Sequence, residues 1–191
     1  PSGGGKSTIL NEVRKIRPDI EYSVSYTTRP PRGDEKNGVH YHFIDEEEFL
    51  RRREEGDFLE TAQVFGHWYG TSISFIKDRL AAQHHIILDI DVQGAAQISS
   101  TSIPYVKIFI MPPSMKILRE RLIKRNTDSL REIEKRLLVA KQEIKFIPQY
   151  DYLIVNDELS VAVEDVLAII RGEENRTNRY PEPIKDFLEE E

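Results

Sequence analysis

The chain contains no cysteine, so disulfide bridges contribute nothing to its fold. It also lacks an apolar run approaching the length of a membrane-spanning helix, and it shows no charged-then-apolar leader, although residues ahead of Pro1 could carry one. Internal repeats and low-complexity tracts are absent too. These absences favour a single globular domain in a reducing cytoplasm.

The chain has no excess of positive charge: its formal net charge is −6. Any polyanion would therefore have to bind a local basic cluster, which argues against a dedicated nucleic-acid binder. With 191 residues, 39% of them hydrophobic and 31% charged, the chain can build one core. We expect small-molecule partners, with neither nucleic acid nor a membrane among them.

The first eight residues, PSGGGKST, carry the pattern of a phosphate-binding loop. Glycines let successive amide N–H groups converge on an anion, the lysine adds positive charge, and the next hydroxyl can bind Mg²⁺. A chance glycine-rich turn is the alternative. The helical spacing of residues 8–16 favours the loop, whose candidate ATP contacts are Ser2, Gly3, Gly4, Gly5, Lys6, Ser7 and Thr8.

The full pattern GxxxxGK[ST] would place its first glycine one position before Pro1. Because a phosphate loop normally follows a buried parallel strand, we expect roughly ten to twenty further residues upstream, enough for one short strand.

Residues 23–72 predict a small antiparallel lobe inserted in an α/β core. Strands are expected at 20–26, 39–44 and 58–65, an aromatic turn at 66–72 and a helix at 73–82. A helix is expected at 46–55, where Asp45 and Glu48 give a capping box. The loop 27–34 holds Arg29 and Arg32, whose guanidinium groups could converge on a phosphate or carboxylate. A solvated surface turn is the alternative.

Two acids, Asp89 and Asp91, end the apolar strand expected at 86–91. Open α/β sheets bind ligands at the carboxyl ends of their strands, so an acid here fits a Mg²⁺ shell. A plain strand-end turn acid is the alternative. Helix 94–98 follows.

Arginines gather on the helices of the second half. Strands are expected at 106–111 and 152–155, and a helix from Ser114 with Arg121 and Arg125 on one face. A helix 130–146 with Arg136 should begin at a capping box of Ser129 and Glu132. For each arginine alone, a solvated helix face is the better interpretation, unless a phosphate site lies nearby. A last helix is expected at 160–171, before a polar tail.

Several motifs, in order and without large gaps, resemble guanylate kinase: SVSYTTRPPRGDEKNGVHYHF, FLETAQVFGHWYGTS, ILDIDVQG, MPPS, RERLIKRNTDS with EKRL, and YDYLIVND. The resemblance runs from Pro1 to about Arg171. It implies an α/β fold of the P-loop NTPase type, with a parallel core (1–22, 73–113, 147–172), a mixed α/β GMP-binding lobe (23–72) and a helical lid (114–146). Residues 173–191 form a tail. The implied reaction is ATP plus GMP giving ADP plus GDP.

The resemblance also implies roles for individual residues. The implied catalytic residues are Lys6, Arg32, Arg121, Arg125 and Arg136. Asn156 and Asp157 would contact the adenine end of ATP, and Ser7 and Asp89 would bind the Mg²⁺ that accompanies it. The implied GMP contacts are Ser25, Arg29, Arg32, Tyr41, Glu60, Tyr69, Thr71 and Asp91.

The guanine preference has a chemical reason. Guanine offers N1–H and an exocyclic amine as donors and O6 as an acceptor, which Glu60 and Thr71 complement. Adenine would present Glu60 with a lone pair, and such polar pairing can discriminate by roughly 10⁴ or more. Glu60 therefore predicts GMP and dGMP as substrates.

One departure lies in the lid, where Lys124-Arg125-Asn126 stands in place of the Gly-Arg-Gly of many members and would stiffen the turn. A non-catalytic guanylate-kinase-like interaction module is one alternative, although such modules typically have eroded loops and lids. A kinase for another monophosphate, such as AMP or UMP, is the second.

Overall fold

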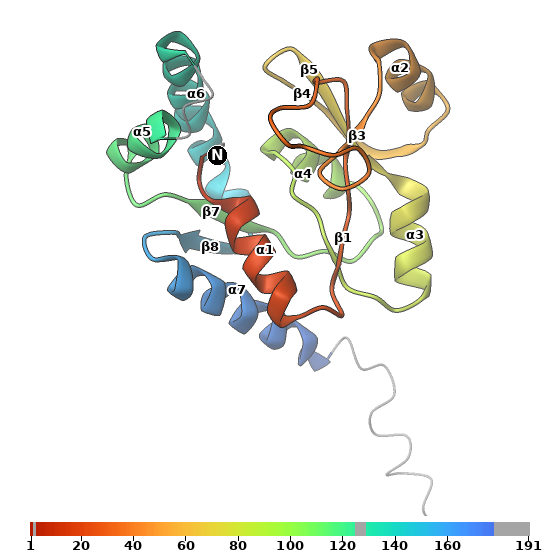
Figure 1. The fold of residues 1–191 in the computed structure, drawn as a ribbon. Coiled ribbons are helices and arrows are strands. Elements are labelled where there is room, and N and C mark those ends of the chain that lie inside the picture. The colour runs from red at the N-terminus through yellow and green to blue at the C-terminus, as the bar shows by residue number, and fades with distance from the viewer. Residues whose placement is uncertain (2, 125–128, 178–191) are drawn as a thin grey trace, which may run out of the picture.

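The computed structural model describes residues 1, 3–124 and 129–177, which form both helices and strands (Figure 1). The helices are α1 (Lys6–Ile16), α2 (Glu46–Glu54), α3 (Ile73–Ala81), α4 (Val92–Ile98), α5 (Met115–Lys124), α6 (Leu130–Glu143), the 3₁₀ helix η1 (Ile144–Gln149) and α7 (Leu159–Glu174). The strands are β1 (Glu21–Tyr22), β2 (Tyr26–Thr27), β3 (His42–Phe43), β4 (Phe58–Val64), β5 (His67–Ser72), β6 (Ile86–Ile87), β7 (Ile108–Met111) and β8 (Tyr152–Val155). No helix in these ranges is both long and apolar enough to cross a bilayer.

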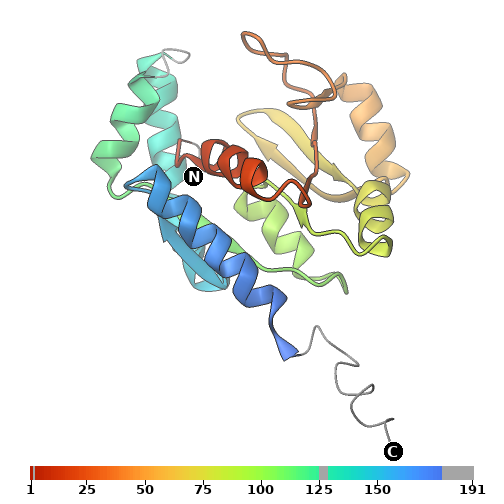
Figure 2. The ribbon, with the colours of Figure 1, turned by 60° about the horizontal axis from the view of Figure 1, so that its bottom comes forward.

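The core strands run parallel, which confirms the expected α/β class. They form two separate pairs, β1 with β6 and β7 with β8, and not the single sheet that the sequence predicts. Helices α1 and α7 lie side by side in both ribbon views (Figures 1 and 2) and pack on the second pair. Their shared core includes Ile9 and Val13 of α1, Ile154 of β8 and Val163 of α7.

An apolar cavity of about 330 Å³ separates the two pairs. Aliphatic side chains line it, among them Ile87 of β6, Ile110 of β7, Ile98 of α4 and Val166 of α7. The expected strand ahead of the phosphate loop stays a prediction.

The predicted strand 20–26 is divided between two sheets. Its first part, β1, pairs with β6 in the core, and its end, β2, pairs with β5 in the lobe. The chain leaves the core at this point, so a continuous strand cannot form.

The lobe is a sheet in the order β3-β2-β5-β4, antiparallel except for the parallel β2–β3 pair. The prediction of a turn over 66–72 is wrong, because His67–Ser72 is the strand β5. The turn consists of Phe65 and Gly66, whose φ values of 50° and 82° match a two-residue hairpin that follows the twist of its strands.

An aromatic stack holds α2 against this sheet. Phe49 is fully buried, and its ring lies 4.6 Å from that of Phe58 and 5.9 Å from that of Trp68, measured between centroids. Asp45 begins α2 by accepting a hydrogen bond from the amide of Glu48 at 2.8 Å, as predicted.

The region expected to form the lid is a pair of helices, α5 and α6, with its own small core that includes Leu118, Leu122 and Leu137. Ser129 and Glu132 form the predicted capping box at the start of α6. The helix ends at Glu143, earlier than expected, because the chain tightens into η1. Residues 125–128 lie outside the described residues.

The aromatic stack generates a stability prediction. Replacing Phe49 with alanine leaves a cavity under α2, so we expect the free energy of unfolding to fall by about 3–5 kcal/mol. Urea unfolding followed by tryptophan fluorescence measures it. Phe65→Ala, at a ring that is 44% exposed in the same lobe, is the control. Equal losses in the two variants would contradict the assignment of Phe49 to the lobe core.

Candidate active site

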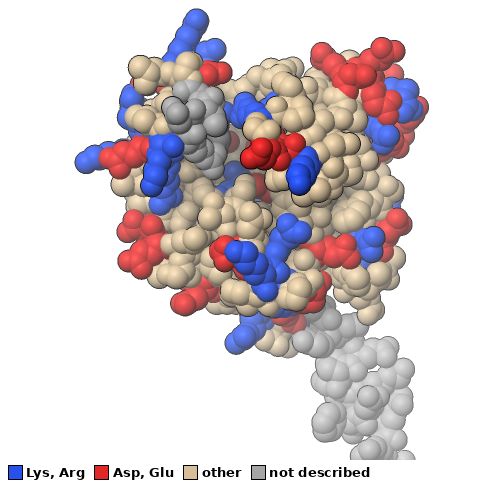
Figure 3. Space-filling model, in the orientation of Figure 1, with Lys and Arg blue, Asp and Glu red and all other residues tan. Residues whose placement is uncertain are grey.

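A cleft of about 440 Å³ opens between the phosphate loop, the lobe and the lid. Basic and acidic side chains meet around the hollow in the middle of this face (Figure 3). The predicted site residues that line the cleft are Gly3, Gly5, Lys6, Ser7, Ser25, Arg29, Arg32, Tyr41, Glu60, Tyr69, Asp89, Asp91 and Arg136.

The loop begins α1 with glycines in left-handed conformations. Gly3 and Gly5 have φ values of 89° and 92°, which residues with a side chain rarely adopt. The Lys6 ammonium lies 3.8 Å from Asp89 Oδ1, and the Ser7 hydroxyl donates to Asp89 Oδ2 at 3.2 Å. A cation, a hydroxyl and a carboxylate therefore meet at the start of α1.

The Ser7–Asp89 pair suits a magnesium ion. Mg²⁺ prefers hard oxygen ligands and is usually bound by one or two protein groups, with water and substrate phosphate completing its shell. Among the described residues no group of three or more His, Cys, Asp or Glu side chains could hold a metal. The donor set fits an ion that arrives with a nucleotide, and does not fit an all-protein metal cage.

A second hollow of about 330 Å³ lies on the other side of the loop and shares Gly3 and Gly5 with the cleft. It is lined by three further predicted ATP contacts, Thr8, Asn156 and Asp157, together with Arg121. The phosphate loop thus lines both the cleft and the second hollow, an arrangement that suits a site for two substrates.

Asn156 and Arg121 tie this hollow to the loop. The Asn156 amide donates to the Gly4 carbonyl at 2.9 Å, and Arg121 Nη2 donates to the Asn156 carbonyl at 2.9 Å. Arg121 Nη1 is buried without a hydrogen-bond partner among the described residues. A methyl group built on Gly5 would lie 3.9 Å from that nitrogen, so an unused donor faces the loop.

Arginines and tyrosines gather in the lobe part of the cleft. Arg29 is 5% exposed, donates from Nη2 to Glu35 at 2.9 Å, and places its guanidinium carbon 5.3 Å from the Tyr41 ring centroid. The Tyr41 and Tyr69 rings are 5.9 Å apart, and burial raises the pKa of Tyr41 to about 12. Arg32 lines the same part of the cleft with an exposed side chain.

Glu60 is a carboxylate buried in the cleft, with only 4% of its surface exposed. Burial raises its pKa to about 7, and the nearby negative charge of Asp91 acts in the same direction. A 2.6 Å hydrogen bond from the Thr71 hydroxyl to Oε1 opposes the shift. A small change of environment can therefore decide whether this group is charged at neutral pH.

Thr71 and Asp91, whose GMP contacts stay predictions, make hydrogen bonds within the protein as well. Thr71 is fully buried behind Glu60 and does not line the cleft, so its hydroxyl orients the carboxylate. Asp91 lines the cleft but accepts from the amides of Gln93 and Gly94, which makes it the N-cap of α4.

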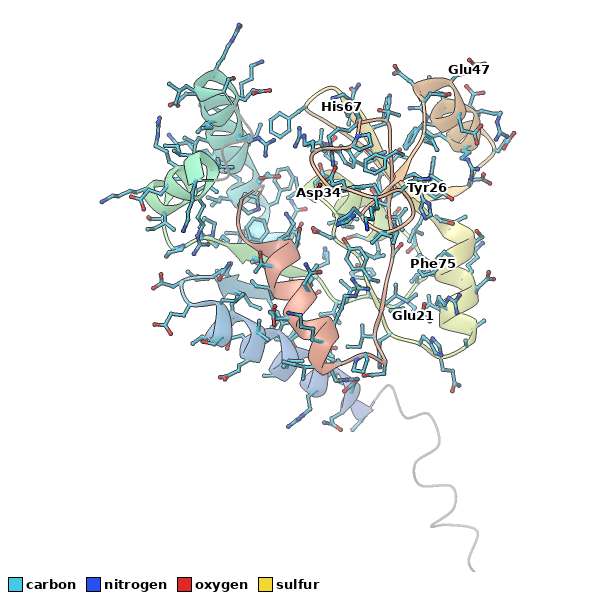
Figure 4. All side chains as sticks on the ribbon, in the orientation of Figure 1. Glu21, Tyr26, Asp34, Glu47, His67 and Phe75 are labelled. Atoms are coloured by element: carbon cyan, nitrogen blue, oxygen red, sulfur yellow. The ribbon has the colours of Figure 1, made fainter. Side chains whose placement is uncertain are left out.

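The lid meets the lobe across the cleft mouth. Arg136 of α6 places its guanidinium carbon 5.3 Å from the Phe65 ring centroid. Figure 4 shows this hairpin end, marked by His67, facing α6. Two predicted site residues, Ser2 and Arg125, lie outside the described residues.

Sequence reasoning missed two functional candidates here. Glu35 pairs with Arg29 and also accepts from the Arg32 amide at 2.8 Å, so it shapes the arginine loop. The sequence feature that could have identified Glu35 is an acidic residue three positions after Arg32. The sequence could not predict the role of Phe65, because its contact with Arg136 joins segments that are distant along the chain.

A phosphate loop heading a helix, an inserted lobe with a buried acid and a lid carrying arginines define a P-loop nucleoside-monophosphate kinase fold. The family model described as guanylate kinase matches residues 1–173. The chain is 44% identical to a guanylate kinase of Thermotoga maritima, over 98% of this chain and 90% of that protein. It is 46% identical to one of Legionella pneumophila strain Paris, over 89% and 81%.

A solved structure agrees. The guanylate kinase from Anaplasma phagocytophilum superposes with a TM-score of 0.76 at 37% identity, over 90% of this chain and 83% of that one. The chain therefore belongs to the guanylate kinase family.

The raised pKa of Glu60 predicts a pH-dependent stability difference. Between pH 4.5 and about 7 the unfolded chain has lost the Glu60 proton while the folded protein keeps it, so rising pH lowers stability. Glu60→Gln has no such proton. Its stability relative to the unchanged protein should therefore rise through that window and level off above it, as measured by urea unfolding at a series of pH values.

The control for this measurement is Glu54→Gln, which replaces an exposed carboxylate in α2. A stability difference for Glu60→Gln that stays constant from pH 4.5 to 7 would contradict the burial of Glu60 described here.

Proposed function

We propose that this protein transfers the γ-phosphoryl group of ATP to GMP or dGMP, giving ADP and GDP. The observation that carries this proposal is Glu60, a buried carboxylate in the same cleft as the phosphate loop, with arginines and tyrosines beside it.

GMP fits the lobe part of the cleft. Glu60 would accept hydrogen bonds from guanine N1–H and the exocyclic amine, and Thr71 would hold it in place. Arg29, Arg32, Tyr41 and Tyr69 would bind the phosphate, with Ser25 nearby. A guanidinium fork matches phosphate oxygens well, and Arg29 already donates a hydrogen bond to an anion, the Glu35 carboxylate, at 2.9 Å.

ATP fits the loop and the second hollow. Its adenine end would lie beside Asn156 and Asp157, and its phosphates would pass over the amides that precede α1. The γ-phosphate would then lie near Lys6, on the side of the loop that faces the cleft. Arg121 Nη1, which has no hydrogen-bond partner in the part of the chain that the structure describes, would meet the phosphate chain.

The chemistry would be in-line attack of a GMP phosphate oxygen on the γ-phosphorus. That oxygen is already anionic at neutral pH, so no strong general base is needed. Lys6, Arg32, Arg121 and Arg136, with Arg125 from the lid turn, would align the reactants and offset the charge that spreads over the transferring group. Lid closure would exclude water, which would otherwise accept the phosphoryl group.

Mg²⁺ held near Ser7 and Asp89 would neutralise phosphate charge on the ATP side. The earlier expectation of a cytoplasmic location stays a prediction.

The alternative of a non-catalytic interaction module finds no support. Lys6 and Ser7 lie beside Asp89 at the start of α1, and Arg121 and Arg136 are present in α5 and α6. The curated relatives described above carry the name guanylate kinase.

The deciding experiment is a coupled ADP-release assay with GMP, dGMP, AMP and UMP. We expect turnover with GMP and dGMP, and a loss of roughly 10⁴-fold in kcat/KM with AMP. Lys6→Ala should abolish turnover. Lys15→Ala, which removes an exposed α1 lysine paired with Glu12, should leave it unchanged. Turnover on AMP equal to that on GMP would contradict the substrate, and no turnover at all would favour the interaction module.

Arg121 offers a further prediction with a control on the same helix. Arg121→Ala removes a guanidinium that faces the loop, so we expect kcat to fall by about 10²-fold or more. The melting temperature should fall only slightly, because the hydrogen bond to the Asn156 carbonyl is lost. Arg119→Ala breaks only a surface ion pair with Glu134 and should change neither quantity. An Arg121→Ala enzyme with full kcat would remove Arg121 from the proposed machinery.

A further inference from the structure

Helix α4 contains a glycine that its backbone does not require. Gly94 lies in the first turn of α4 and is not among the glycines with positive φ. Alanine is favoured over glycine in a helix by roughly 0.5–1 kcal/mol. The reason for glycine at this position must therefore lie in the space around it.

That space is occupied by the Glu60 carboxyl group. A methyl carbon built on Gly94 would lie 2.9 Å from Glu60 Cδ, 3.4 Å from Cγ and closest of all to Oε2. The other carboxylate oxygen, Oε1, accepts from Thr71 at 2.6 Å. Glu60 is thus held between a hydroxyl on one side and the bare backbone of α4 on the other.

Helix α4 cannot easily move away, because glutamines fasten it to β4. The Gln97 side chain accepts from the Thr61 amide at 3.0 Å and donates to the Thr61 carbonyl at 2.6 Å, as a neighbouring strand would. Gln93 Nε2 donates to the Gln63 carbonyl at 3.3 Å. Figure 1 shows α4 close beneath the β4–β5 hairpin. A side chain at position 94 would therefore turn the Glu60 carboxylate before it moved the helix.

We propose that Gly94 is a specificity-determining positioning residue for guanine, which keeps the Glu60 carboxylate where it can accept from N1–H and the exocyclic amine of the base. The proposal rests on the function proposed above. Any side chain at 94 pushes the carboxylate out of this position, and the loss falls on base recognition and not on the phosphate chemistry.

The test is Gly94→Ala assayed with GMP and with inosine monophosphate, whose base is guanine without the exocyclic amine. We expect kcat/KM for GMP to fall about tenfold or more and the preference for GMP over inosine monophosphate to shrink. The KM for ATP should stay within about twofold. The melting temperature should not fall, because alanine suits the helix and turning one flexible side chain relieves the contact.

Two further variants make the test specific. Gly172→Ala in α7, where a methyl group would meet nothing within 4 Å, is the matched control and should behave as the unchanged protein does. Glu60→Asp withdraws the carboxylate, so Gly94→Ala should add little loss in that background, whereas independent effects would multiply.

The outcomes separate the two proposals. An unchanged preference in Gly94→Ala, or an equal loss for both nucleotides with a lowered melting temperature, would overturn the role of Gly94 while leaving the kinase intact. If Glu60→Gln also kept the full preference for GMP, base reading by Glu60 would fail, and the inference with it.

Discussion

The burial of one carboxylate, that of Glu60, is the constraint on which the account of this protein depends. Removing a carboxylate from water disfavours its charged form, and here burial raises the pKa to about 7. A ligand that donates hydrogen bonds to the charged form recovers part of that cost, and a ligand that cannot donate does not. The fold keeps the group there with the Thr71 hydroxyl and the bare backbone of Gly94.

The phosphate loop would bring a second nucleotide next to the ligand that Glu60 recognises. Gly3 and Gly5 border both the cleft and the second hollow, so a nucleotide on each side would present its phosphates to the same short segment. Lys6 adds positive charge on the cleft side and Arg121 on the other. Two nucleotide sites that share one positively charged loop would hold the reactants next to each other. This arrangement suits phosphoryl transfer, which depends on positioning and charge and needs no general base here.

Local signals in the sequence predicted the α/β class and most helix starts to within two residues, whereas most of the residues that line the cleft came from the resemblance to guanylate kinase. Asp45 and Ser129 cap their helices as expected, because capping depends on neighbours three residues apart. Contacts between distant segments could not be predicted. Thr71 orients Glu60 from behind, Glu35 occupies Arg29, and Gly94 matters only because folding brings α4 against β4.

The most direct measurement of the central claim is the pKa of Glu60 by carboxyl ¹³C NMR, with Glu60→Gln used for assignment. The account predicts titration near pH 7 in the free protein, well above the ordinary value of 4.5. GMP should then shift that titration to markedly lower pH, because its donors favour the charged carboxylate. A Glu60 signal that titrates near pH 4.5 and does not respond to GMP would contradict the account.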